Sequence, residues 1–265
     1  MKIGIVGCAG RMGRMLIQEV LRTPGAALAG GTEPAGAAVG QDLGILVGAT
    51  AAGVVVTSDT KALFAASDAV IDFTVPDATM RHAVIAGDTG KALIIGTTGL
   101  KENDQKLIEL AAKRTVIVQS PNMSLGVNVL LALTEKLAAT LGPDYDIDIL
   151  EMHHRHKVDA PSGTALGLGE AAAKGRGVKL KDTARMVRDG QVGARPVGEI
   201  GFATLRGGDV IGDHTVIFAA DGERIEITHK ASSREIFARG AVRAAMWSKG
   251  KAPGRYSMRD VLGLG

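Results

Sequence analysis

The segment 151–165, EMHHRHKVDAPSGTA, concentrates side chains that can hold, donate or accept protons. Three of the six histidines of the chain and two basic residues fall within five consecutive positions: His153, His154, Arg155, His156 and Lys157. Histidine titrates near neutral pH, so such a cluster suits proton transfer, and its positive charge attracts an anion. A solvated basic loop, a metal site and a pocket for an anionic substrate are the three explanations.

The spacing argues against a metal site. Neighbouring residues of an extended chain point to opposite faces, so His153 and His154 would not face one ion together. The helical zinc signature HExxH is absent from the sequence, and Arg155 and Lys157 would repel a dication. We therefore expect no metal ion in this segment.

The residues after the histidines indicate a binding site for an anion. A helix is expected over 165–173, with Ser162 or Thr164 near its N-cap. The free N–H groups of a helix N-terminus attract anions, and Gly163 would let a ligand approach closely. Together with the basic cluster, this arrangement predicts a substrate that carries carboxylates, and a solvated basic loop is the alternative.

A second candidate site, for a dinucleotide, lies at the N-terminus. Gly7, Gly10 and Gly13 are spaced GxxGxxG between an apolar strand expected over 2–7 and a helix expected over 11–23. At such a junction the backbone N–H groups of the helix face a pyrophosphate. The spacing differs from the GxGxxG fingerprint, so a plain strand–turn–helix is the alternative.

Three further segments strengthen the prediction of a dinucleotide site. Glu33, twenty positions beyond Gly13, ends the second expected strand, where a carboxylate accepts hydrogen bonds from an adenosine ribose. The loops 96–99 and 120–123, GTTG and SPNM, each follow an apolar strand. Ligands of open α/β sheets bind beyond the carboxyl ends of the strands, so these loops would form the rim of a cofactor cleft.

The first half of the chain alternates apolar strands with helices. The clearest helix is expected over 102–114, and strands are expected at 26–31, 53–57, 69–75, 92–96 and 116–118. Strands that are apolar throughout and alternate with helices indicate a parallel sheet covered on both faces. The sequence therefore predicts a doubly wound, Rossmann-like α/β domain.

The second half follows a different pattern. After an amphipathic helix over 125–141, strands with alternating polar and apolar residues are expected at 144–152, 199–206, 210–219 and 223–228. A GGD hairpin turn would join the second and third of these strands. The pattern predicts an α+β domain with an open mixed or antiparallel sheet, whose other face could bury against copies of the chain.

These patterns divide the chain into two domains. A final helix over 233–248 contains the only tryptophan and is expected to return to the first domain. We therefore expect a dinucleotide-binding domain of residues 1–124, joined by 234–265. Residues 125–233 would form a domain for substrate binding and oligomerisation.

Composition excludes several classes of protein. Aromatic residues make up only 3% and the net charge is +3 without a Lys/Arg block, so a nucleic-acid partner is not expected. No apolar stretch approaches the ~20 residues that span a bilayer, and MKIGIVG is typical of a first strand rather than a signal peptide. The single cysteine, Cys8, excludes an intrachain disulfide. These features predict a soluble cytoplasmic protein without a membrane partner.

Four motifs together resemble the dihydrodipicolinate reductase family, also called 4-hydroxy-tetrahydrodipicolinate reductase. They are GCAGRMG at 7–13, GTTG at 96–99, EMHHRHKVDAPSGTA at 151–165 and THKASSREIFARGAVRAAMW at 228–247. The resemblance extends over essentially the whole chain. It implies a homotetramer assembled through the open sheet of the second domain. It also implies NADH- or NADPH-dependent reduction of a cyclic dicarboxylate in the diaminopimelate route to lysine.

The resemblance implies roles for individual residues. His153 corresponds to a proton donor and acceptor, and Lys157 to a proton donor. His154, Gly163 and Thr164 correspond to substrate-binding positions. The positions that correspond to cofactor contacts are Gly7, Cys8, Ala9, Gly10, Arg11, Met12, Glu33, Gly96, Thr97, Thr98, Ser120, Pro121, Asn122 and Met123.

One position departs from the family pattern. Many members carry an arginine directly after the ribose-binding glutamate, whereas this chain has Pro34. The preference between NADH and NADPH is therefore open, and the use of both is expected.

Two other functions fit the first-domain pattern. One is a different two-domain NAD(P)-dependent oxidoreductase, in which the histidine cluster would lack a role. The other is a nucleotide-sensing protein without catalysis.

Overall fold

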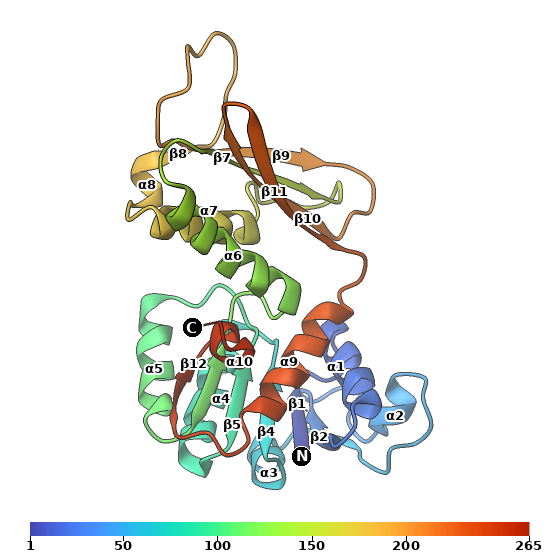
Figure 1. Ribbon diagram of the computed structural model, residues 1–265. Coiled ribbons are helices and arrows are strands. Elements are labelled where there is room, and N and C mark those ends of the chain that lie inside the picture. The colour runs from blue at the N-terminus through green and yellow to red at the C-terminus, as the bar shows by residue number, and fades with distance from the viewer. Residues whose placement is uncertain (265) are drawn as a thin grey trace. The chain divides into compact units, whose positions relative to one another are not determined.

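The computed structural model describes residues 1–264, and the chain divides into two compact units (Figure 1). Unit 1 comprises Met1–Leu125 and Glu235–Gly265, and unit 2 comprises Gly126–Arg234. The C-terminal segment thus returns to the unit that contains the N-terminus. Each unit has a sheet and a hydrophobic core of its own.

Unit 1 is built on a seven-stranded sheet whose paired strands are all parallel. In spatial order its strands are β12 (Gly254–Tyr256), β6 (Val116–Gln119), β5 (Ala92–Ile95), β4 (Ala69–Asp72), β1 (Lys2–Val6), β2 (Ala27–Thr32) and β3 (Val56–Thr57). The chain winds outward from β1 in both directions, which is the doubly wound order. The predicted Rossmann-like α/β domain is confirmed.

Helices cover both faces of this sheet. On one face α1 (Arg11–Arg22) packs against α9 (Glu235–Trp247), and α10 (Met258–Leu262) packs on α9. The other face carries α3 (Thr60–Ala66), α4 (Pro76–Thr89) and α5 (Glu102–Ala112). Successive strand residues enter opposite cores, as Val70 and Ile71 of β4 do. Burial on both faces explains why these strands are apolar throughout. The short helix α2 (Leu43–Leu46) lies in the segment between β2 and β3.

Unit 2 contains a five-stranded mixed sheet. Its spatial order is β11 (Glu223–Ala231), β10 (Gly212–Ala220), β7 (Asp146–His153), β9 (Ile200–Arg206) and β8 (Ala184–Arg185). The inner face of the sheet packs on α6 (Leu125–Leu141) and α7 (Gly163–Gly175), with α8 (Leu180–Thr183) beside α7. Alternation along β7 buries Ile147 and Ile149 in this core, as predicted for a strand with one covered face.

The predicted GGD hairpin is wrong. β7 lies between β9 and β10, so residues 207–209 connect two strands that do not pair with each other. The hairpin in this unit joins β10 to β11, where Ala220 pairs with Glu223 across the two residues Asp221 and Gly222. Gly222 has a φ of 83°, which glycine adopts without strain, and Asp-Gly is a preferred two-residue hairpin turn.

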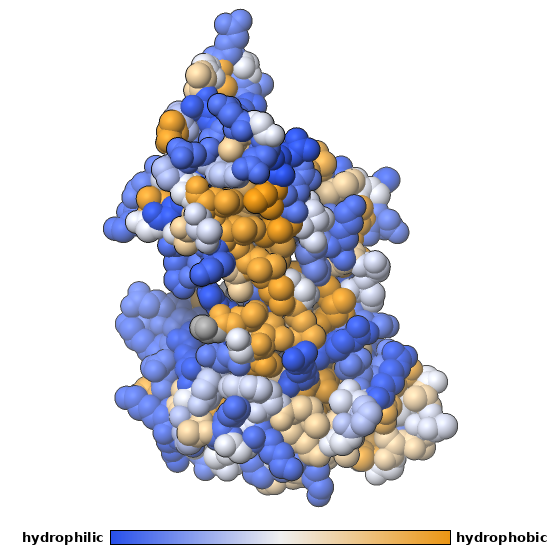
Figure 2. Space-filling view, viewed as in Figure 1, coloured by the Kyte–Doolittle hydropathy of each residue, from blue (hydrophilic) through white to orange (hydrophobic). Residues whose placement is uncertain are grey.

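Apolar side chains remain exposed on the helices of unit 2. Val129 and Leu133 of α6 and Leu166 of α7 are exposed, and apolar surface gathers over these helices in Figure 2. Within residues 1–264, no helix has both the length and the apolar character needed to cross a bilayer.

Candidate active site

The glycine loop lies at the carboxyl end of β1, in the centre of the sheet of unit 1. Gly7 has a φ of 67°, in the left-handed region that favours glycine. A Cβ on Gly13 would lie 2.2 Å from the carbonyl oxygen of Gly7, so only glycine lets α1 approach the loop this closely. Gly10 is the N-cap of α1 and no side chain caps the helix, which leaves its first amides for a phosphate.

Glu33 follows β2 directly and lies beside the glycine loop. Its Oε1 accepts a hydrogen bond from the backbone N–H of Ala9, with an N–O distance of 2.6 Å. Arg11, which follows Gly10, and Pro34, which follows Glu33, are both exposed. An uncapped helix N-terminus with a carboxylate beside it fits the pyrophosphate and the ribose of a dinucleotide.

Two of the predicted cofactor residues, Cys8 and Met123, have side chains in the hydrophobic core of unit 1. Cys8 is fully buried, and burial, with the negative charge of Glu33 nearby, raises the pKa of its thiol to about 12. Met123 is also buried, in the core of unit 1, where a Cβ on Gly240 would lie 1.7 Å from the Met123 carbonyl oxygen. Only the backbone of these two residues is available to a cofactor.

The loops after β5 and β6 complete the carboxyl edge of the sheet. In the second loop the hydroxyl of Ser120 donates to the carbonyl oxygen of Asn122 at 2.8 Å, and Pro121 is exposed. In the first loop Thr98 is exposed, whereas Thr97 is buried. The predicted cofactor segments therefore all lie at the carboxyl ends of strands of one sheet.

A buried polar network lies beneath Thr97, and sequence reasoning missed it. Asp72, at the end of β4, is fully buried and binds Nδ1 of His82 at 2.7 Å, while its other oxygen accepts from Thr97 at 3.3 Å. Thr74 donates to the same oxygen through its amide and its hydroxyl, and the hydroxyl of Thr79 donates to Thr97 at 2.9 Å. Burial alone would raise the pKa of Asp72, but the bonds from His82 and Thr74 hold it below its usual value. The network anchors the loop after β5, which is predicted to contact the cofactor.

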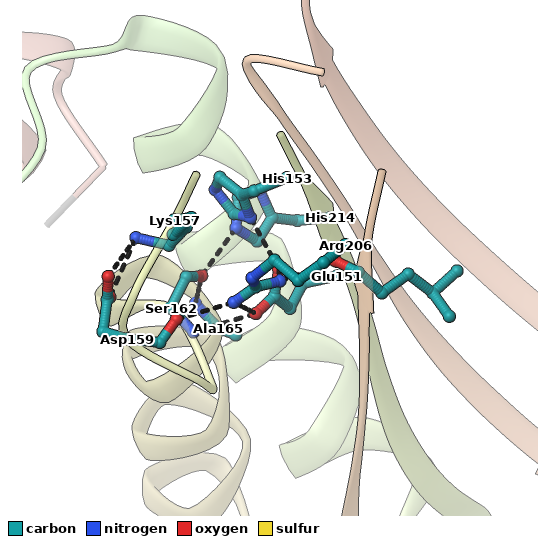
Figure 3. Close-up of polar contacts among 9 residues, drawn as sticks. Glu151, His153, Lys157, Asp159, Ser162, Ala165, Arg206 and His214 are labelled. Atoms are coloured by element: carbon teal, nitrogen blue, oxygen red, sulfur yellow. Dashed lines mark hydrogen bonds and ion pairs between the residues drawn. The ribbon is translucent and has the colours of Figure 1, made fainter. Parts of the chain in front are cut away.

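In unit 2, the last residue of β7 is His153, and its ring binds a buried carboxylate (Figure 3). Nδ1 of His153 lies 2.5 Å from Oε2 of Glu151, which is only 1% exposed. Residues two apart on a strand share a face, so β7 directs both side chains to the inner face of the sheet. Arg206, which pairs with His153 on the neighbouring β9, donates from its two Nη atoms to the two carboxylate oxygens at 2.8 and 2.9 Å.

Lys157 lies in the loop after β7 and is held by an acid. Its Nζ contacts both carboxylate oxygens of Asp159, at 2.7 and 2.8 Å, and the hydrogen bond from Lys157 lowers the pKa of Asp159. Within residues 1–264, Lys157 makes no hydrogen bond to His153. The two predicted proton donors thus lie in one short segment, each paired with its own carboxylate.

The N-terminus of α7 lies beside the Glu151 carboxylate. Ser162 is the N-cap: its Oγ accepts from the amide of Ala165 at 3.1 Å, and its own amide donates to Glu151 at 3.0 Å. The predicted anion-binding residues Gly163 and Thr164 form the first turn that follows. Of the two N-caps considered from the sequence, the structure has Ser162.

One histidine contacts this turn, and another directly follows His153 in the chain. His214 of β10 places Nε2 3.0 Å from Oγ of Ser162, and its ring packs edge-on to that of His153. Burial, and then the charge of His153, lower the pKa of His214 to about 4, so it is neutral at physiological pH. His154 is half-buried, and burial together with the positive charge of Arg234 lowers its pKa. His214 had no local signal in the sequence, whereas Arg234 lies within the motif 228–247 but had no role assigned to it.

No group of three or more metal-ligating side chains comes together anywhere in residues 1–264.

Comparison with known proteins agrees with this geometry. Residues 1–123 match the family profile described as dihydrodipicolinate reductase, N-terminus, and residues 126–262 match the profile described as dihydrodipicolinate reductase, C-terminus. The chain belongs to the dihydrodipicolinate reductase family. The resemblance inferred from the four motifs is thereby confirmed. The predicted class, an NAD(P)H-dependent oxidoreductase, and the predicted pair of cofactors, NADH and NADPH, are confirmed with it.

Relatives in this family cover the chain from end to end. A 4-hydroxy-tetrahydrodipicolinate reductase of Methylocella silvestris is 55% identical over 266 residues, covering 100% of this chain and 98% of that protein. One of Ruegeria sp. is 55% identical over 263 residues, covering 99% and 98%. Among solved structures, a dipicolinate-bound dihydrodipicolinate reductase from Paenisporosarcina sp. TG-14 is 20% identical, with a TM-score of 0.77 and 97% of each chain covered.

Proposed function

We propose that this protein catalyses the NAD(P)H-dependent reduction of 4-hydroxy-tetrahydrodipicolinate to tetrahydrodipicolinate, in the diaminopimelate route to lysine. The observation that carries the proposal is the buried pair of Glu151 and His153 at the end of β7, beside the first turn of α7. A histidine supported by a carboxylate supplies a proton donor, and the helix N-terminus supplies a site for an anion. Reduction of a cyclic dicarboxylate needs both.

The substrate carboxylates are expected to bind around the N-terminus of α7. The amides of Gly163 and Thr164 lie in its first turn, where the partial positive charge of the helix dipole is concentrated. His154 would contribute a polar contact, and Arg234, whose charge acts on His154, adds a cation at the same place. The dipicolinate named with the Paenisporosarcina enzyme is a ligand of this chemical class.

The proton chemistry follows from the two protonatable residues of the histidine segment. When bound, NADH or NADPH supplies the hydride. The 4-hydroxyl group of the substrate leaves as water, and the hydride adds to the conjugated imine that remains. Negative charge then develops toward the ring nitrogen of the substrate, and the imidazole of His153 donates a proton to it. Lys157 adds positive charge that stabilises the same developing anion. Because Asp159 holds the ammonium of Lys157 in the structure, a dianionic substrate has to share that ammonium with Asp159.

In unit 1, the proposed dinucleotide site uses the glycine loop, Glu33 and the loops at 96–98 and 120–123. The amides of Arg11 and Met12, in the first turn of α1, are expected to bind the pyrophosphate, because those of residues 7–10 already donate to acceptors within the protein. Glu33 is expected to bind the adenosine ribose. In the two later loops the side chains of Thr98 and Pro121 are exposed, and that of Asn122 is half-buried.

The proposed enzyme is a homotetramer of the cytoplasm. The outer face of the sheet in unit 2 carries apolar side chains that its own helices do not cover, among them Leu205, which is 48% exposed. Ile217 and Leu150 lie on the same face and are only partly buried. Pairing of such faces between copies would bury them, which supports assembly through unit 2.

A coupled absorbance assay tests the proposed function. The purified chain is given 4-hydroxy-tetrahydrodipicolinate with NADH or with NADPH. Oxidation of each cofactor is followed by the loss of its nicotinamide absorbance. We expect turnover with both cofactors. A matched control is His156→Ala, because His156 is an exposed member of the same histidine cluster and should be dispensable. Tight binding of NADH without turnover would indicate a nucleotide sensor and overturn the proposal.

A further inference from the structure

We propose that Glu151 is the positioning residue of this active site. Held by Arg206 and the N-terminus of α7, it fixes His153 as the Nδ1–H tautomer and leaves Nε2 as the atom that exchanges the proton with substrate. The inference rests on the proposed function for the role of His153. The sequence singled out the histidines but assigned nothing to Glu151 or Arg206.

The first argument is the saturation of the Glu151 carboxylate. Four donors converge on its two oxygens: Nδ1 of His153 at 2.5 Å, the Nη atoms of Arg206 at 2.8 and 2.9 Å, and the amide of Ser162 at 3.0 Å. Burial alone would raise the pKa of Glu151, but the hydrogen bonds from Arg206 and His153 keep it below its usual value. An ionised carboxylate only accepts hydrogen bonds, so Nδ1 of His153 must carry the proton.

Arg206 keeps Glu151 from turning away from His153. Besides its two bonds to the carboxylate, its guanidinium donates to the carbonyl oxygens of Leu205 and Asp159, both at 2.6 Å. A planar guanidinium that meets a carboxylate through two parallel bonds fixes the orientation of both groups. The orientation of the imidazole therefore follows from the register of β9 on β7.

The second argument is the space beside Nε2. A Cβ on Gly212 of β10 would lie 2.9 Å from Nε2 of His153, closer than Cβ contacts normally come. The absence of a side chain at Gly212 therefore leaves room at that nitrogen. With Nδ1 bound to Glu151, Nε2 is the ring nitrogen left to face a ligand.

The titratable and polar groups around His153 come from four elements besides β7. They are Arg206 of β9, His214 of β10, the cap of α7 at Ser162, and the Lys157–Asp159 pair of the loop after β7. His214 is neutral at physiological pH, and Lys157 is paired with Asp159. Glu151 is thus the anion in direct contact with the ring, and removing its charge should weaken proton binding at His153.

The test compares Glu151→Gln and Glu151→Asp in the full chain by the pH dependence of kcat. In Glu151→Gln we expect kcat to fall about 10- to 100-fold, as when a group that orients a histidine is lost. The basic limb of its profile should move down by about one pH unit, because an anion no longer supports the imidazolium. Glu151→Asp should keep the limb where the wild type has it. A matched control is Glu170→Gln, an exposed change on α7 in the same unit, which should alter neither quantity.

If Glu151→Gln keeps both the kcat and the basic limb of the wild type, the inference is overturned. The position of the limb is decisive, because a residue needed only for folding would not change the pH at which the activity falls. If Glu151→Gln does not fold, the tautomer is read directly in the wild-type chain by 15N NMR of labelled histidine, with the His153 signals assigned by their loss in His153→Gln. The Nδ1–H form supports the inference, and the Nε2–H form overturns it. Because this reading needs no turnover, it separates failure of the inference from failure of the proposed function.

Discussion

Replacing Glu33 by glutamine should shift the cofactor preference toward NADPH. The Glu33 carboxylate accepts from Ala9 through Oε1, so a glutamine can keep this bond while losing the charge. A 2′-phosphate on the ribose bound there would lie about 5 Å from that charge. At this separation two unit charges repel by about 1–3 kcal/mol, for effective dielectric constants of roughly 20 to 80. The ratio of kcat/KM for NADPH over NADH should therefore rise by about 5- to 150-fold.

The wild-type chain should use both cofactors, with NADH equal to or better than NADPH. Pro34 supplies no cation beside Glu33, and Arg11 of the glycine loop is the base that opposes Glu33. Arg11→Ala should accordingly weaken NADPH more than NADH, and Pro34→Arg should favour NADPH.

The assay is the measurement of kcat/KM with both cofactors, for the wild type and for each variant. Glu102→Gln is the matched control, because Glu102 lies exposed at the start of α5 in the same unit and should leave the ratio unchanged. An unchanged ratio in Glu33→Gln would refute the reasoning. A wild-type preference for NADPH of about tenfold or more would mean that Arg11, or another base, outweighs Glu33.

Three further expectations concern catalysis, stability and assembly. His153→Ala and Lys157→Ala should each lower kcat by about 10²–10⁴, and the double variant should be far less than additive, because both act on one developing charge. Near-wild-type turnover of either single variant would remove that residue from catalysis. Asp72→Asn breaks a buried ionic network, so the midpoint of thermal unfolding should fall by about 6–20 °C. Asp88→Asn, in an exposed ion pair, should change it little, and equal shifts would contradict the role of the network. Light scattering should report a tetramer, and an active monomer at micromolar concentration would contradict assembly through unit 2.

Most of the fold of unit 1 could be predicted because its signals are local. Strands buried on both faces, such as β4 and β5, are continuous apolar runs, and helices between them carry a helical period. β12 is only three residues long, too short for any period, and its place beside β6 depends on the return of α9. In unit 2 the strands were recognised by alternation, but their order was not, because β7 pairs with strands far along the chain.

In the candidate site, too, local features could be predicted, whereas contacts between segments far apart in the chain could not. His153, Lys157 and the helix start near Ser162 were visible because they lie in one short segment. The pairing of Glu151 with His153 had a usable signal, since residues two apart on a strand share a face. Arg206 had none, because its approach to Glu151 depends on the register between β7 and β9.

The most direct test of the central claim follows the hydride itself. The chain is incubated with 4-hydroxy-tetrahydrodipicolinate and NADH deuterated at the transferable position, and the product is analysed by mass spectrometry. We predict that each NADH oxidised places one deuterium in tetrahydrodipicolinate, and that His153→Ala slows this transfer by about 10²–10⁴. Cofactor binding without transfer of deuterium to that product would contradict the account.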